Sequence, residues 1–324
     1  MNPWLDRLGW REGESVCEDG STRRYVRAHK DGKTAIFMDC AGPPTPGHAL
    51  ADFVRIGGWL RDIGLRAPEI YEYDAAQGYA LVEDFGDVSL KKALGQGEDP
   101  ARLYGRAAEI LNHLGKQSCP LSLPDYHESH VHQGHRRVID WYLPAVKKRR
   151  NPDGALQVYQ AAWKDIEQSL PPCPRGFLHI DYHAENLMVL PGGTIGILDF
   201  QGAMHGPLPY DLANLLEDAR LDVPADIRAA ILQAHDESFR LWYRVLGTQF
   251  HCRVIGQFIK LALRQGKTHY LDNLPRLQRY IRDALADPVL RPLRQYFSEI
   301  DLDFEAKNDL NVAEIADFIQ DDAF

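Results

Sequence analysis

Residues 177–201 read FLHIDYHAENLMVLPGGTIGILDFQ and place three oxygen-bearing side chains on turns beside short apolar runs. Asp181 and Asn186 share the first turn, and Asp199 follows the second apolar run. Enzymatic phosphoryl transfer depends mainly on positioning and on neutralisation of phosphate charge by Mg²⁺. It needs a carboxylate beside the acceptor hydroxyl and oxygen ligands for the metal. This stretch supplies both, and it predicts a magnesium-dependent phosphoryl transferase.

A hairpin within the same stretch is expected to bring two of these side chains together. Residues 187–190 and 195–198 are short apolar strands, and the Pro-Gly-Gly sequence between them turns the chain back. Asn186 lies just before the first strand and Asp199 just after the second, so the hairpin places them close to each other. Two hard oxygen ligands suit Mg²⁺, which keeps several waters and takes further ligands from substrate phosphates.

Composition excludes several classes of protein. The chain has 324 residues and a formal net charge of -9, which argues against a nucleic-acid partner. We find no basic leader and no apolar run of about 18 residues, and we expect a cytoplasmic protein with no membrane segment. Five cysteines without a CxxC pair predict neither a disulfide framework nor a zinc site. We expect a monomer that acts on a small molecule.

The N-terminal part of the chain has the pattern of a small antiparallel sheet with one helix. Residues 23–40 alternate as two strands around Asp31-Gly32, a dipeptide suited to a two-residue hairpin turn. A helical apolar pattern follows and stops near Gly64. Two more strands surround a turn at Gly78. We therefore expect an N-lobe over residues 1–85.

The remaining chain, residues 86–324, is expected to form a larger, mostly helical C-lobe. The fold class is α+β. Helical periodicity predicts the segments 99–117, 136–148, 155–169, 209–220, 224–246 and 250–265. The last thirty residues are expected to pack as a helix or arm with a frayed end.

The catalytic and metal loops carry a resemblance to a known family. HIDYHAEN, followed by LDFQ, resembles the loops of the aminoglycoside phosphotransferase and choline kinase family, relatives of the protein kinases. Within that family, the sequence most resembles kinases that phosphorylate N-acetylmuramate and N-acetylglucosamine at the anomeric hydroxyl in bacterial cell-wall recycling. The residues that carry this closer match include Ser21-Thr22-Arg23-Arg24-Tyr25 and Met38-Asp39. The resemblance implies a protein-kinase-like two-lobed fold, with ATP and Mg²⁺ as cofactors.

Carried over to this chain, the resemblance assigns roles within the motif. Asp181 would be the catalytic base, and Asn186 and Asp199 would be the Mg²⁺ ligands. His179 would brace the loop through its ring. Asp211 would be structural, as the cap of the following helix.

The residues expected to bind the nucleotide match the kinase pattern less closely than the catalytic loop does. Gly20, Ser21, Thr22, Arg23 and Arg24 would form the phosphate loop. Glu83, Asp84 and Phe85 would form an adenine-binding hinge. Asp84-Phe85-Gly86 spells the metal-binding tripeptide of protein kinases, but it precedes the catalytic loop instead of following it. The third strand carries Met38 where a kinase has its phosphate-binding Lys, so Arg23, Arg24 and Arg27 are the nearest basic candidates.

The acceptor is the least determined feature. His183, Glu185 and Gln201 are candidate contacts with an amino-sugar substrate. An aminoglycoside or choline-type amino alcohol is the main alternative acceptor. A nucleotide-binding pseudokinase module is a second alternative, motivated by the absent Lys. Four histidines between 127 and 135 are expected to be loop or surface residues, not a zinc site.

Overall fold

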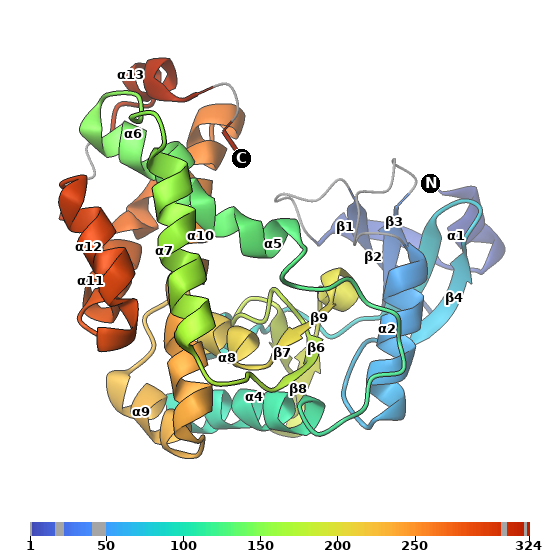
Figure 1. Cartoon of the computed structure of the whole chain (residues 1–324). Coiled ribbons are helices and arrows are strands. Elements are labelled where there is room, and N and C mark those ends of the chain that lie inside the picture. The colour runs from blue at the N-terminus through green and yellow to red at the C-terminus, as the bar shows by residue number, and fades with distance from the viewer. Residues whose placement is uncertain (1, 17–22, 41–49, 306–309, 321–322) are drawn as a thin grey trace. The chain divides into compact units, whose positions relative to one another are not determined.

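The computed structural model describes residues 2–16, 23–40, 50–305, 310–320 and 323–324 (Figure 1). Contacts between residues divide the chain into two compact units. Unit 1 comprises Met1–Ser122 and His179–Ala203, and unit 2 comprises Leu123–Leu178 and Met204–Phe324. The catalytic and metal loops therefore pack with the N-terminal sheet. The expected lobe boundary at residue 85 stays a prediction.

Unit 1 is built on a five-stranded antiparallel sheet of order β1-β2-β3-β5-β4. The strands are β1 (Arg11–Ser15), β2 (Arg24–Lys30), β3 (Lys33–Asp39), β4 (Ile70–Asp74) and β5 (Tyr79–Glu83). The predicted turn between β2 and β3 is confirmed, because Asp31 and Gly32 have φ angles of 49° and 75°. Positive φ at both central residues gives a turn whose twist matches that of the flanking strands. This turn fixes the register in which Tyr25 lies opposite Met38.

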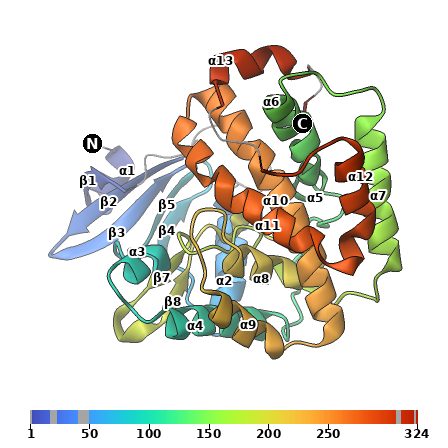
Figure 2. The ribbon, with the colours of Figure 1, turned by 90° about the vertical axis from the view of Figure 1, so that its left-hand side faces the viewer.

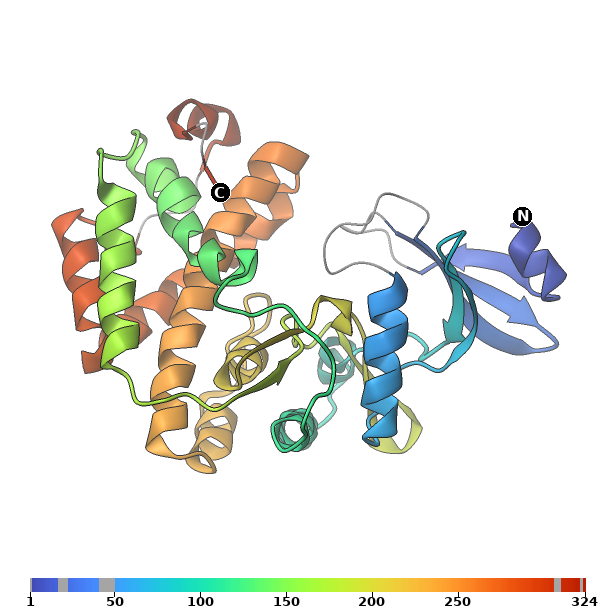
Figure 3. The ribbon, with the colours of Figure 1, turned by 45° about the vertical axis from the view of Figure 1, so that its right-hand side comes forward.

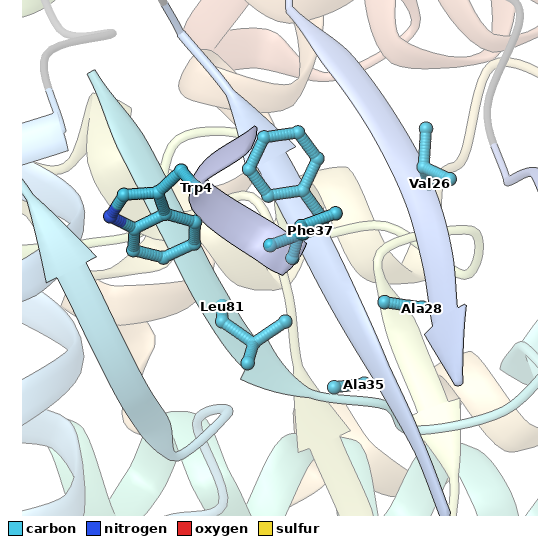
Figure 4. Close-up of a cluster of buried hydrophobic side chains, with 7 residues drawn as sticks. Trp4, Val26, Ala28, Ala35, Phe37 and Leu81 are labelled. Atoms are coloured by element: carbon cyan, nitrogen blue, oxygen red, sulfur yellow. The ribbon is translucent and has the colours of Figure 1, made fainter. Parts of the chain in front are cut away.

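The two faces of this sheet have different neighbours. On one face, Val26, Phe37 and Leu81 pack against Trp4 and Leu5 of the short helix α1 (Pro3–Arg7), as Figure 4 shows for most of this cluster. Helix α2 (Leu50–Asp62) stands on the other side of the sheet (Figure 3). Strand residues alternate between faces, so the side chains at positions 25 and 38 point away from the α1 cluster.

Helix α2 ends where its sequence predicts and contacts the metal loop. Gly64 takes a φ of 85°, and Leu65 donates its N–H to the Leu60 carbonyl at 2.9 Å. Glycine adopts this left-handed conformation without a Cβ penalty. The Phe53 ring stacks on the Phe200 ring with 5.0 Å between centroids. The residue after Asp199 is thereby held by α2. Unit 1 also contains α3 (Leu90–Gly95), α4 (Pro100–Leu114) and the hairpin of β7 (Leu187–Val189) and β8 (Ile195–Ile197).

Unit 2 is mostly helical. The long helix α10 (Glu237–Gln265) packs beside α8 (Pro209–Leu216) and α11 (Leu274–Leu285) (Figure 2). Its other elements are α5 (His130–Gln133), α6 (Leu143–Lys147), α7 (Ala155–Ser169), α9 (Ala225–Gln233), α12 (Arg291–Glu299), α13 (Val312–Ile315) and the antiparallel pair β6 (Arg175–Leu178) and β9 (Met204–Pro207). No helix within the described ranges is long and apolar enough to span a membrane.

Three helix predictions in unit 2 were wrong in their bounds. The expected helix 209–220 ends at Leu216, as α8. The expected helix 224–246 is divided between α9 and α10, because Asp236 caps α10 by accepting a hydrogen bond from Phe239 N at 2.8 Å. The expected break between the helices 224–246 and 250–265 does not exist, since residues 247–249 are buried residues within α10. The prediction for the histidine segment was only partly right. His127 lies in a turn and His130 is exposed at the start of α5, but His135 is buried against Tyr159 and Trp163.

Candidate functional site

The catalytic turn is closed by its own backbone and by one amide side chain. His183 N donates to the Asp181 carbonyl at 3.1 Å, and Asn186 Nδ2 donates to the same carbonyl at 2.9 Å. Ile180 precedes Asp181 with a φ of 79°, which is a strained conformation for a β-branched residue. Such strain persists only where the surroundings impose it, and it clusters at functional sites. The half-buried Asp181 side chain is thus presented from a closely constrained turn.

The predicted hairpin brings Asn186 and Asp199 together. Leu198 N donates to the Asn186 carbonyl at 2.9 Å, extending the β7–β8 pairing as far as the metal loop. The side chains then meet, with Asn186 Nδ2 3.5 Å from Asp199 Oδ2. Asp199 is exposed and has a φ of 61°, and its Oδ1 accepts a hydrogen bond from Gln201 Nε2 at 2.5 Å.

His179 and Tyr182 connect the catalytic turn to neighbouring segments through hydrogen bonds. The His179 Nε2 atom lies 2.8 Å from the Leu198 carbonyl oxygen, so this ring links the residues preceding Asp181 and Asp199. Burial lowers the pKa of His179, which keeps the imidazole neutral near pH 7. Tyr182 donates its hydroxyl to the Ala107 carbonyl of α4 at 2.9 Å. The contact of His179 with Leu198 joins the two loops, and its bracing role stays a prediction.

The side chains of Asn186 and Asp199 fit a magnesium ion. Both carry oxygen donors, the ligand type that Mg²⁺ prefers, and the Asn186 carbonyl is hydrogen-bonded to the residue before Asp199. In the described part of the chain, no group of three or more His, Cys, Asp and Glu residues forms a metal cluster. Mg²⁺ does not need one, because it is commonly bound by one or two carboxylates together with waters and substrate phosphates.

The hinge side chains have structural partners. The Glu83 carboxylate accepts a hydrogen bond from Arg66 at 2.6 Å, and Asp84 is bound by Arg27 through contacts of 2.7 and 3.2 Å. The Phe85 ring lies against Gly196 of β8 and under the Arg66 guanidinium, 5.4 Å from it. Asp84 is therefore engaged with an arginine, in agreement with its exclusion as a metal ligand. Only backbone groups of this hinge remain as candidates for adenine binding.

The N-terminal basic residues differ in their surroundings. Gly20, Ser21 and Thr22 lie outside the described residues. Arg23 is buried and donates from Nη1 to the Tyr25 hydroxyl at 3.2 Å. Arg24 is exposed and forms an ion pair with Glu12. Met38 is buried, with 2% of its surface exposed.

The three candidate substrate contacts lie around the catalytic and metal loops. The Glu185 carboxylate accepts a hydrogen bond from Lys91 of α3 at 2.7 Å. His183 Nε2 lies 3.3 Å from Asn186 Nδ2, and the buried Gln201 supports Asp199. Lys91 was not found from the sequence, since it lies 94 residues from its partner and belongs to no motif.

Asp211 does not cap its helix as expected. Helix α8 begins two residues earlier, at Pro209, and its N-cap position is Leu208, which makes no side-chain capping bond. The fixed φ of proline favours the first helical turn, which accounts for the earlier start. Asp211 lies in that first turn and is 1% exposed. A carboxylate there still interacts favourably with the helix dipole.

The chain matches known proteins over most of its length. The model of the family described as "Phosphotransferase enzyme family" matches residues 14–246. A protein of Caulobacter vibrioides named N-acetylmuramate/N-acetylglucosamine kinase is 32% identical over 88% of this chain and 90% of its own. A protein of Pseudomonas aeruginosa with the same name is 30% identical over 94% and 97%.

Solved structures agree on the fold. A choline/ethanolamine kinase family protein of Mesorhizobium loti superposes with a TM-score of 0.60 at 17% identity, covering 87% of this chain and 93% of that one. The expected two-lobed, protein-kinase-like α+β fold is thereby confirmed. With a family match that includes both the sheet and the catalytic motif, the chain belongs to the phosphotransferase enzyme family.

Proposed function

We propose that this phosphotransferase is an ATP- and Mg²⁺-dependent kinase that phosphorylates the anomeric hydroxyl of N-acetylmuramate or N-acetylglucosamine. The observation that carries the reaction type is the grouping of Asp181, Asn186 and Asp199, in which Asn186 Nδ2 lies 2.9 Å from the Asp181 main-chain carbonyl and 3.5 Å from Asp199 Oδ2. The acceptor is supported by four relatives named N-acetylmuramate/N-acetylglucosamine kinase, at 27% to 32% identity. We place the reaction in cell-wall recycling in the cytoplasm, and the enzyme as a monomer.

Each site residue has a distinct task in this proposal. Asp181 accepts a hydrogen bond from the acceptor hydroxyl, orients it and takes its proton as the acceptor oxygen bonds to the γ-phosphorus of ATP and the bond from that phosphorus to ADP breaks. Asn186 and Asp199 hold Mg²⁺, which neutralises the charge of the ATP phosphates when bound. Gln201 fixes the Asp199 carboxylate, and His179 keeps the two loops in register. An anomeric hydroxyl is more acidic than an ordinary alcohol, so a carboxylate of ordinary basicity suffices.

The acceptor position can be tested with the purified protein, ATP and Mg²⁺. N-acetylglucosamine and N-acetylmuramate should be consumed, and ³¹P NMR should show a sugar 1-phosphate. The matched control is methyl N-acetylglucosaminide, which keeps the rest of the sugar and blocks the anomeric oxygen. We expect no transfer to it. Phosphorylation of the methyl glycoside at a rate near that of the free sugar would overturn the anomeric assignment.

The same assay separates the alternatives. Transfer to choline or an aminoglycoside, with none to the amino sugars, would replace the proposed acceptor and leave the chemistry intact. Calorimetric binding of ATP with Mg²⁺, without transfer to any acceptor in the panel, would favour a pseudokinase module. The paired metal-ligand candidates argue against that outcome.

A further inference from the structure

The sheet presents one arginine near the position where a phosphate-binding lysine is expected. In related kinases the strand equivalent to β3 carries that Lys, and here the position holds the buried Met38. Tyr25 of β2 lies directly opposite Met38 in the strand register. Arg23 lies just before β2, and its guanidinium reaches the Tyr25 side chain, donating to the Tyr25 hydroxyl at 3.2 Å. Arg23 and Met38 thus belong to the same side of the sheet.

Arg24 and Arg27 also belong to this segment, and both form ion pairs with carboxylates. Arg24 lies on the opposite face of β2, is exposed and pairs with Glu12. Arg27 shares the face of Tyr25, but its guanidinium is bound by Asp84 at 2.7 Å and by Asp87 at 2.7 Å. Binding a phosphate through Arg27 would require breaking a largely buried ion pair, which is costly.

The surroundings of Arg23 connect it with the metal site. The residue is 8% exposed, and its guanidinium donates to the Tyr25 hydroxyl at 3.2 Å. Burial raises the pKa of that hydroxyl, the Arg23 charge opposes the rise, and the Asp199 carboxylate adds to it. The Tyr25 hydroxyl therefore lies within electrostatic range of both Arg23 and the candidate Mg²⁺ ligand. Metal-bound phosphates need cationic donors in this neighbourhood.

We propose that Arg23 supplies the phosphate-binding cation that the strand lysine supplies in related kinases, and that it donates hydrogen bonds to the phosphate oxygens of ATP. This inference rests on the proposed function, since it requires ATP at the Asp199 site. Guanidinium suits the task because its planar fork binds phosphate through two hydrogen bonds. Tyr25 positions the guanidinium through its hydroxyl, and Met38 fills the space of the absent lysine with an apolar side chain.

Calorimetric binding of ATP with Mg²⁺, compared with binding of adenosine, tests the proposal without relying on turnover. Arg23→Gln should weaken ATP binding by roughly 10- to 100-fold, the usual effect of losing charge-assisted hydrogen bonds, and leave adenosine binding within about twofold. Arg11→Gln is the matched control, an exposed arginine of β1, and should change neither affinity. Unchanged ATP binding in Arg23→Gln, or equal loss of ATP and adenosine binding, would overturn the role of Arg23.

Two further measurements keep the result unambiguous. If Arg23→Gln does not fold, the NMR signal of the Arg23 Nε–H in the wild-type protein, assigned with Arg23→Lys, should shift with ATP and not with adenosine. Absence of a shift with ATP would contradict the proposal. If the wild-type protein binds no ATP, the proposed function itself fails. Wild-type ATP binding combined with an inert Arg23 rejects this inference alone.

Discussion

Gly196 marks a contact between the metal hairpin and the hinge that a single methyl group should break. A Cβ at this position would lie 2.6 and 2.7 Å from two carbons of the Phe85 ring. Ordinary van der Waals contact begins at 3.4 Å, so in Gly196→Ala the ring must withdraw by about 1 Å. We expect a loss of about 1–3 kcal/mol in the free energy of unfolding, the usual cost of overpacking a filled site.

The same change should reach the nucleotide site, because Phe85 belongs to the hinge proposed to bind adenine. We expect weaker ATP binding by calorimetry, while kcat at saturating ATP stays near the wild-type value. Gly105→Ala is the matched control within unit 1. It lies in helix α4 with no atom within 4 Å of the added Cβ, and it should gain about 0.5–1 kcal/mol from helix propensity.

Chemical denaturation of both variants measures the predicted changes in stability, and calorimetric titration with ATP measures the predicted change in affinity. The additional change Phe85→Leu should restore part of the stability of Gly196→Ala, since it removes the colliding ring atoms. The reasoning is refuted if Gly196→Ala unfolds at the wild-type denaturant concentration and binds ATP normally while Gly105→Ala shows its expected gain.

Three other substitutions test the contributions of buried ionisable side chains to stability. Burial lowers the pKa of His135 to about 3, below the value of about 6.5 in the unfolded chain, so the unfolded state binds the proton first and stability falls as pH drops below about 6.5. Between pH 7 and pH 5 this group should cost about 2 kcal/mol, and His135→Phe should remove that part of the pH dependence in denaturation experiments. Asp84→Asn should lower the free energy of unfolding by about 1–3 kcal/mol, because it breaks the paired contacts to Arg27; equal stability by denaturation would contradict this. Glu217→Gln should cost about 1–3 kcal/mol, since this 3%-exposed carboxylate accepts a hydrogen bond from Tyr243 and faces two arginines; wild-type stability of the variant in chemical denaturation would contradict this explanation.

Much of the fold follows from sequence periodicity, and the failures have local causes. The helix over 155–169 and the turn at Asp31-Gly32 were predicted correctly, because apolar spacing and turn chemistry determine them directly. Strand β1 was missed, since REGES has no apolar alternation and is largely exposed. It is a strand because β2 offers it hydrogen-bonding partners. Such tertiary pairing leaves no periodic signal in the strand itself.

The local features of the site could likewise be predicted from the sequence, and its long-range contacts could not. The turn carrying Asp181 and the hairpin that brings Asn186 to Asp199 are local, and their geometry could be predicted from the motif. The pairing of Arg27 with Asp84 joins residues 57 positions apart. That contact depends on how β2 and the hinge pack, which no local pattern specifies. This contact distinguishes Arg27 from Arg23 and Arg24, which lie in the same short segment of the sequence.

The most direct test of the proposed chemistry is the turnover of Asp181→Asn with N-acetylglucosamine or N-acetylmuramate as acceptor. Asparagine keeps the size of the side chain but cannot take the acceptor proton. We expect kcat to fall by roughly 10²- to 10⁴-fold, the range for a lost general base, while calorimetry shows wild-type affinity for ATP with Mg²⁺. A variant that retains near-full kcat would contradict the assignment of Asp181 and, with it, the proposed mechanism.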